Sequence, residues 1–234
     1  MGAKELVRPA VAELVGTALF VFAGAGSVVV NATFPQAVGG VGIAAAHGIA
    51  IAVLVSSLMN VSGAHLNPAV TLGLFAARKV DGPTTGAYIA AQLVGAVLGA
   101  ALLKWVLPAS ATTLVDLGTP AVAASVNRYQ AVAIEAVFTF LLMSAVFGTA
   151  VSSAAPAVGG FAIGLAVFVA GVVAGPLTGA ALNPARAFGP ALIALEFHAQ
   201  GLYWIGPISG ATLAALLWKT ILLPKEGERR NTKT

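Results

Sequence analysis

The strongest constraint on the fold is a short stretch of sequence that occurs twice. Residues 63–70 read Gly-Ala-His-Leu-Asn-Pro-Ala-Val, residues 179–186 read Gly-Ala-Ala-Leu-Asn-Pro-Ala-Arg, and six of the eight positions match. The two Asn residues, Asn67 and Asn183, lie 116 positions apart in a chain of 234 residues. A specific motif repeated at half the chain length predicts two similar halves.

Each copy of the motif also predicts the start of a helix. The triplets are Asn67-Pro68-Ala69 and Asn183-Pro184-Ala185. Asn is among the favoured N-cap residues because its side-chain oxygen accepts a backbone N–H, and Pro fits the first helical position. The carboxamide NH₂ is then still free to donate. We therefore expect each helix start to present two hydrogen-bond donors and the positive end of a helix dipole.

The composition places these helix starts in a membrane. The chain is 59% hydrophobic and only 9% charged. Neither the stretch between Glu13 and Arg78 nor that between Glu135 and Arg186 contains Asp, Glu, Lys or Arg. About 20 apolar residues suffice to cross a bilayer. The predicted spans are roughly 10–30, 39–59, 84–107, 129–151, 158–173 and 202–222, with short helices at 67–78 and 183–195.

The repeat predicts the topology of an all-α membrane protein with a single domain over residues 1–234. Repeats at about 9–107 and 128–223 each contain three spans and one half-span, joined by a connection at 108–128, and a charged tail follows at 225–234. Because three is odd, the second half enters from the opposite side and forms an inverted repeat. The two half-helices then meet N-terminus to N-terminus and together cross the membrane once.

The basic residues orient the chain. Arg8, Arg78 and Lys79 fall on the same side as the basic C-terminal tail, so the positive-inside rule predicts that both termini are cytoplasmic. The net charge of +4 is explained by this topology rather than by nucleic-acid binding. We expect a multi-pass protein of the cell (plasma) membrane.

In these features the chain resembles the major intrinsic protein family, the aquaporins and glycerol facilitators, over residues 9–223. The resemblance implies a right-handed bundle of six spans and two half-helices that forms a homotetramer with one pore per subunit. It implies a passive water channel that excludes protons and ions, without cofactor or metal. The alternative is a broader channel that also passes glycerol, urea, ammonia or hydrogen peroxide.

The donors explain how such a pore could work. Water in a narrow apolar channel is oriented by the few fixed groups it meets. Asn67 and Asn183 would each donate to a passing water, and the opposed helix dipoles would break the chain along which a proton hops. Arg186, three residues past Asn183, would add a fixed charge. The simpler interpretations are a plain helix cap for each Asn and a structural salt bridge for Arg186.

Two acidic residues and one histidine complete the candidate site. Glu13 and Glu135 are intramembrane carboxylates at equivalent repeat positions. They could serve acid–base chemistry or a proton relay, but we favour a structural role as acceptors for N–H groups of the loops before the short helices, which the resemblance supports. His65 is replaced by Ala181 in the second copy. It is expected to pack near the cytoplasmic mouth, where a gating role is possible, and His198 is expected to be exposed.

The family spacing assigns the narrowest point of the pore to His47, Gly171, Ala180 and Arg186. Gly171 resembles the glycerol type, whereas Ala180 supplies no apolar wall for a carbon backbone. His47 is similar to the residue of plant vacuolar channels, and it could swing inward to fill the gap beside Gly171. Ala187 after Arg186, and the pair Tyr203-Trp204, resemble water channels instead. The sequence leaves this choice open.

Three other classes of function compete with a passive pore. An enzyme would need a nucleophile and base or a metal cluster, and the chain has no Cys and only three scattered His residues. A structural membrane protein would keep the fold and conduct little. A coupled transporter would show gradient-dependent uptake. The sequence therefore favours a non-enzymatic channel, with water and the lipid bilayer as its partners.

Overall fold

The computed structural model describes residues 3–224, and the tail predicted at 225–234 lies outside them. The long helices are α1 (Ala3–Thr33), α2 (Pro35–Ser62), α4 (Gly82–Val106), α6 (Arg128–Val146), α7 (Phe161–Thr178) and α9 (Gln200–Leu217). Turns of π-helix, Phe147–Val151 and Trp218–Leu222, continue α6 and α9. Within the described part, six helices are long and apolar enough to cross a membrane, which confirms the predicted all-α fold.

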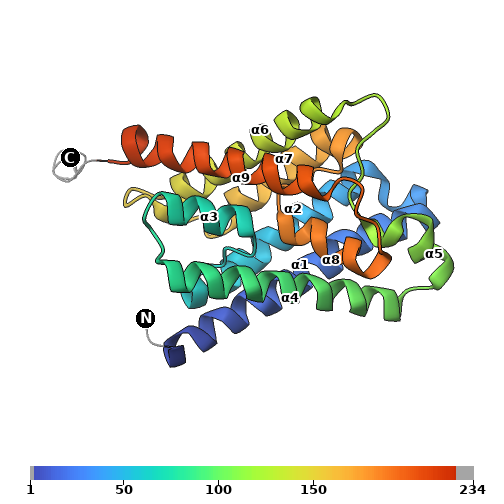
Figure 1. Cartoon of the computed structure of the whole chain (residues 1–234), viewed down its shortest axis with the longest axis horizontal. Helices are drawn as coiled ribbons and strands as arrows, with labels where there is room; N and C mark the ends of the chain where they lie inside the picture. Colours follow the sequence, from blue (N-terminus) through green and yellow to red (C-terminus); the bar gives the residue numbers. More distant parts are fainter. Residues whose placement is uncertain (1–2, 225–234) are drawn as a thin grey trace.

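Two short helices fill the middle of the bundle. Helix α3 (Pro68–Ala76) packs against α9, and α8 (Pro184–Ala194) packs against α4. Figure 1 shows them end to end between these two long helices. They have 9 and 11 residues, and at about 1.5 Å per residue their combined length matches a hydrocarbon core of about 30 Å. The two half-spans therefore together make one crossing.

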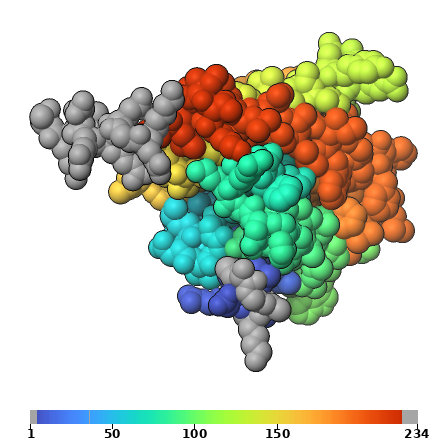
Figure 2. Space-filling view, turned by 60° about the vertical axis from the view of Figure 1, so that its left-hand side comes forward, coloured from blue at the N-terminus to red at the C-terminus, as the bar shows by residue number. Residues whose placement is uncertain are grey.

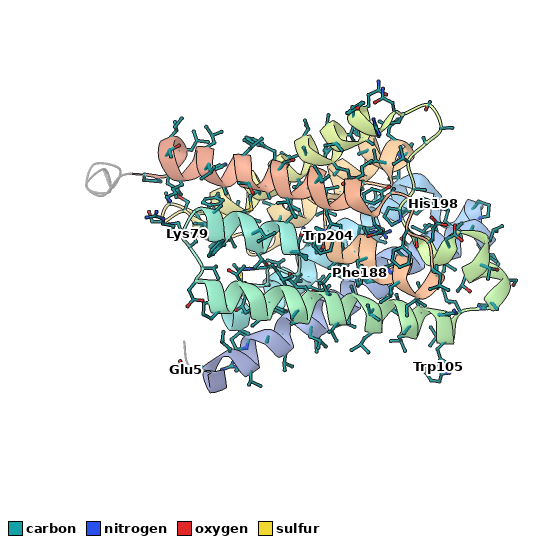
Figure 3. The ribbon with its side chains drawn as sticks, viewed as in Figure 1. Glu5, Lys79, Trp105, Phe188, His198 and Trp204 are labelled. Carbon is teal, nitrogen blue, oxygen red and sulfur yellow. The ribbon has the colours of Figure 1, made fainter. Side chains whose placement is uncertain are left out.

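The chain ends lie at one end of the bundle. The beginning of α1 and the end of α9 are both at the left of Figure 1, and we call this end the terminal face and the opposite end the far face. Figure 2 turns the terminal face forward, with the first half (blue to green) mostly below the second (yellow to red). Figure 3 places Lys79 at the terminal face, and Trp105 and His198 at the far face.

Equivalent residues of the two halves meet in the centre of the fold. Gly48 on α2 and Gly164 on α7 each precede their Asn by 19 positions, and a Cβ on Gly48 would fall 2.7 Å from the carbonyl oxygen of Gly164. Small residues allow such close approach between membrane helices. Contact between a residue and its own repeat equivalent is what a two-fold relation between the halves requires.

Two details differ from the sequence prediction. Helix α7 runs to Thr178 rather than 173, because its apolar sequence continues through Pro176 and ends at Gly179, whose φ of +78° suits glycine. The connection at 108–128 is not simply polar. It contains helix α5 (Ala109–Leu114), which buries Ala111, and a tight turn at Asp116–Gly118.

Candidate functional site

The two Asn-Pro-Ala motifs are joined by crossed hydrogen bonds. Asn67 caps α3 by accepting the N–H of Ala69 at 2.8 Å, and Asn183 caps α8 by accepting that of Ala185 at 3.0 Å. The amide of Asn67 also donates to the carbonyl of Leu182 at 2.9 Å, and that of Asn183 donates to Leu66 at 2.8 Å. One N–H of each carboxamide is therefore used between the halves. The expectation of two free donors at each helix start is wrong, because the facing loop takes one of them.

The loops before α3 and α8 share one unusual backbone. Gly63 and Gly179 leave their helices at φ of +86° and +78°. Positive φ values recur at Ala64 and Leu66, and at the equivalent Ala180 and Leu182, between 44° and 53°. Non-glycine residues in this region cost about 1–3 kcal/mol each and persist only where their surroundings fix them. The groups that fix these loops must therefore be close by.

Glu13 fixes the first loop. Its carboxylate accepts the backbone N–H groups of His65 at 2.9 Å and Leu66 at 2.6 Å, together with the Ser62 hydroxyl at 2.6 Å. Gln92 of α4 donates to the same carboxylate at 2.8 Å. With all of these donors facing it, the buried carboxylate acts as an acceptor for the loop.

Glu135 fixes the second loop in the same way. It accepts the backbone N–H groups of Ala181 at 3.0 Å and Leu182 at 2.7 Å, and the Thr178 hydroxyl at 2.7 Å. Tyr203 closes the arrangement by donating to the Thr178 carbonyl at 2.7 Å, and Tyr88 donates to the Ser62 carbonyl of the first half at 2.8 Å. The sequence analysis did not predict this role, although a tyrosine follows the motif Asn by 21 positions in the first half and by 20 in the second.

His65 belongs to a polar cluster that the second half lacks. Its Nδ1 lies 3.1 Å from the Thr71 hydroxyl, and its ring meets Tyr88 edge to face at 5.1 Å. Gln92 donates to the same hydroxyl at 3.0 Å. Ala181 and Ala187 stand at the equivalent positions of the second half.

Two cavities lie within the bundle, and residues of the constriction that the sequence predicts line them. The near cavity, of about 350 Å³, opens toward the terminal face and is lined by His65, Asn67, Lys79 and Asn183 among others. The far cavity, of about 560 Å³, is lined by all four predicted constriction residues, His47, Gly171, Ala180 and Arg186. The structure thus brings together residues from α2, α7, the second loop and α8.

Arg186 and His47 are held in place within this wall. Arg186 is 2% exposed, and its Nη1 donates to the carbonyl of Gly118 at 2.9 Å, while its Nε has no partner among the described residues. His47 bonds through Nδ1 to the carbonyl of Ile43 at 2.9 Å, which leaves Nε2 without a described partner. The Gly118 carbonyl was missed from sequence, because nothing in a connecting loop signals a contact with a helix 68 residues away.

A second cluster of charged groups lies at the far face, away from this wall. His198 has a side chain that is 93% exposed, as predicted, and it pairs with Glu196. Hydrogen bonds from the backbone and side chain of His198 hold the pKa of Glu196 below its usual range. Both residues line a separate surface pocket with Asp116 and Arg128, outside the axis of the bundle.

Comparison with known proteins identifies the family. The sequence profile described as "Major intrinsic protein" matches residues 2–218. The chain belongs to this family. Major intrinsic proteins are channels, so the chain is an integral, multi-pass membrane protein of a channel family.

The relatives include channels from plants and archaea. The chain is 40% identical over 230 residues to aquaporin TIP4-4 of Zea mays, covering 94% of this chain and 89% of that one. It is 40% identical over 241 residues to aquaporin AqpM of Methanothermobacter marburgensis, covering 92% and 97%. The solved structure of an aquaglyceroporin from Plasmodium falciparum superposes with a TM-score of 0.83 at 22% identity over 93% and 97% of the two chains, which supports the same fold.

Proposed function

We propose that this major intrinsic protein is a passive water pore that excludes protons and ions. The observation that supports it best is the crossed pair of amides. Each Asn has one N–H bound to the opposite loop and one left, and both side chains line the near cavity. Two fixed donors at the meeting point of two helix N-termini orient a passing water by its oxygen, and the positive dipole ends oppose cations.

The surrounding groups fit this role. Arg186 lines the far cavity and supplies a fixed positive charge there. Glu13 and Glu135 accept bonds from the loops and therefore act as structural groups rather than as acid–base groups. We propose that residues 1–234 act as one channel domain, that both termini are cytoplasmic, and that the protein forms homotetramers. The cell membrane remains our prediction for its location.

A broader channel, one that also passes glycerol, urea, ammonia or hydrogen peroxide, is the second candidate. It is favoured by the far cavity, which is lined by the small residues Gly171 and Ala180. A solute that enters this cavity lies beside His47 and Arg186, which both line it. The two candidates differ in solute flux and not in fold.

Stopped-flow light scattering on proteoliposomes separates them. An impermeant osmolyte should shrink the vesicles much faster than protein-free vesicles. Glycerol or urea should then give shrinkage without rapid reswelling if the pore selects water, and rapid reswelling if it is broad. Shrinkage no faster than that of protein-free vesicles would rule out a water pore, and gradient-dependent accumulation of a solute would indicate a transporter.

A further inference from the structure

Three residues line both cavities, and they define the neck between them. These are His47 on α2, Val167 on α7 and Ala180 in the second loop. A molecule that moves from one cavity to the other passes this set. Val167 is not one of the residues to which the family spacing assigns the constriction, whereas Gly171, which is one of them, lines the far cavity alone.

Gly171 lies at a close contact between α7 and α2. A Cβ added there would lie 2.8 Å from the Cβ and 3.0 Å from the Cα of Ala44 on α2. Real Cβ atoms are almost never this close to other heavy atoms, so the absence of a side chain at 171 lets α7 approach α2. The missing side chain therefore does not by itself leave a gap in the wall of the passage.

His47 does not swing to fill a gap beside Gly171 either. Its Nδ1 is bound to Ile43, and its ring packs edge to face on Phe20 with centroids 5.9 Å apart. The ring lies against α1 at Gly24, where an added Cβ would be 2.6 Å from Nε2 and Cδ2. The ring is thus held against α1 by one hydrogen bond and by packing on both residues.

Ala180 is equally fixed, because it contributes only a methyl group on a backbone at φ of +44°. Val167 is different. Its side chain is 8% exposed and ends in two methyl groups, and a β-branched residue in a helix has one strongly preferred rotamer. Its methyl groups are therefore held in place without a hydrogen bond.

We propose that Val167, rather than Gly171, is the α7 side chain that sets the size of solute the pore admits. The proposal rests on the channel function proposed above. The neck then has the fixed ring of His47 on one side and the rigid methyl groups of Val167 on another. A solute with a carbon backbone is wider than water and meets the methyl groups of Val167.

The test compares two identical substitutions on the same helix. Val167→Ala removes the methyl groups at the neck, and Val173→Ala makes the same change at a residue that lines neither cavity and is 51% exposed. Water, glycerol and urea fluxes of both variants and the wild type are measured in proteoliposomes. We expect Val167→Ala to raise the ratio of glycerol to water flux about tenfold or more, in line with the discrimination that a methylene group provides. Val173→Ala should leave the ratio unchanged.

Val167→Ile is the second variant. It tests the proposal even if Val167→Ala does not fold stably. It should lower water flux, because it adds a methylene to a neck with two fixed walls. Equal glycerol-to-water ratios in Val167→Ala and Val173→Ala, or an unchanged water flux in Val167→Ile at equal protein density, would overturn the assignment. Wild-type water flux at the level of protein-free vesicles would instead overturn the proposed water pore. In that case the glycerol and urea fluxes of the two alanine variants would still decide the role of Val167.

Discussion

The loops before α3 and α8 have the same backbone and the same capping bonds, but their electrostatic surroundings differ. In the first loop Glu13 is surrounded by neutral donors, including Gln92 and Ser62. In the second loop Glu135 has fewer polar neighbours, and the cation Arg186 stands where the first copy has Val70. The shared contacts explain how the loops are built. The differences fit the selectivity role that we propose for Arg186, because a backbone scaffold does not need a buried arginine.

The largest expected effect comes from neutralising the two carboxylates separately. Glu135→Gln leaves one donor of the second loop unsatisfied, at a cost of about 1–3 kcal/mol. It also removes a negative charge that interacts with the buried Arg186 without bonding to it, so its loss should be the larger of the two. Glu13→Gln leaves one donor of the loop unsatisfied, which costs about 1–3 kcal/mol. The apparent melting temperature of purified protein measures both effects. We also expect solute selectivity to change in Glu135→Gln alone, and equal selectivity changes in both variants would contradict the comparison.

The crossed amides should give equal effects in the two halves. Asn67→Ser and Asn183→Ser each keep a capping oxygen but lose the donor to the opposite loop, and so leave a buried carbonyl without its partner. The expected loss is about 1–3 kcal/mol in each case, or about 2–12 °C in melting temperature for a chain of this size. The double variant should lose no more than the two single losses together. Clearly unequal losses in the two single variants would show that the two crossed hydrogen bonds do not contribute equally to stability.

A smaller effect is expected where the first half has a polar cluster and the second does not. Thr71→Val removes the hydroxyl that accepts from Gln92 and bonds His65, at a cost of about 1 kcal/mol. Thr17→Val is the matched control, since the Thr17 hydroxyl is equally buried but has no partner among the described residues. Its removal should be neutral or stabilising. If the melting temperature falls equally in both variants, the hydrogen bonds of the cluster do not stabilise the fold.

The smallest effect concerns the starts of two equivalent helices. Asp81 caps α4 by accepting the N–H of Thr84, whereas the N-cap residue of α9 is Ala199, which provides no side-chain cap. Hydrogen bonds from Thr84 hold the pKa of Asp81 below its usual range. A depressed carboxyl pKa stabilises the fold above the unfolded pKa, and this contribution is lost as pH falls below about 4. Melting temperature should therefore fall less steeply with acidification in Asp81→Asn than in the wild type, and identical slopes would argue against the cap.

Much of this architecture could be predicted from sequence because it depends on local rules. The apolar lengths define the spans, the Asn-Pro pairs define the short helices, and the 116-residue offset relates one half to the other. Helix ends were less predictable, since the stop of α7 depends on a positive φ at Gly179 rather than on composition.

The contacts within the site were harder to predict, because they depend on where side chains point. Periodicity and spacing identify Arg186, but they do not reveal that Gly118 provides its carbonyl partner or that the amides of Asn67 and Asn183 cross between the halves. The same limit applies to Gly171. A missing side chain looks like open space in a sequence, and the structure shows that a neighbouring helix lies there.

The crossed bonds between Asn67, Asn183 and the leucine carbonyls also have a consequence for folding during synthesis. The first half leaves the ribosome with the amide of Asn67 and the carbonyl of Leu66 lacking their partners, which lie in residues not yet synthesised. Unsatisfied polar groups are costly inside a bilayer. The first half therefore cannot complete its hydrogen bonds until the second half is inserted. If the chain is divided within the connection at 108–128, we expect each fragment to be degraded when expressed alone and to be stable when both are co-expressed.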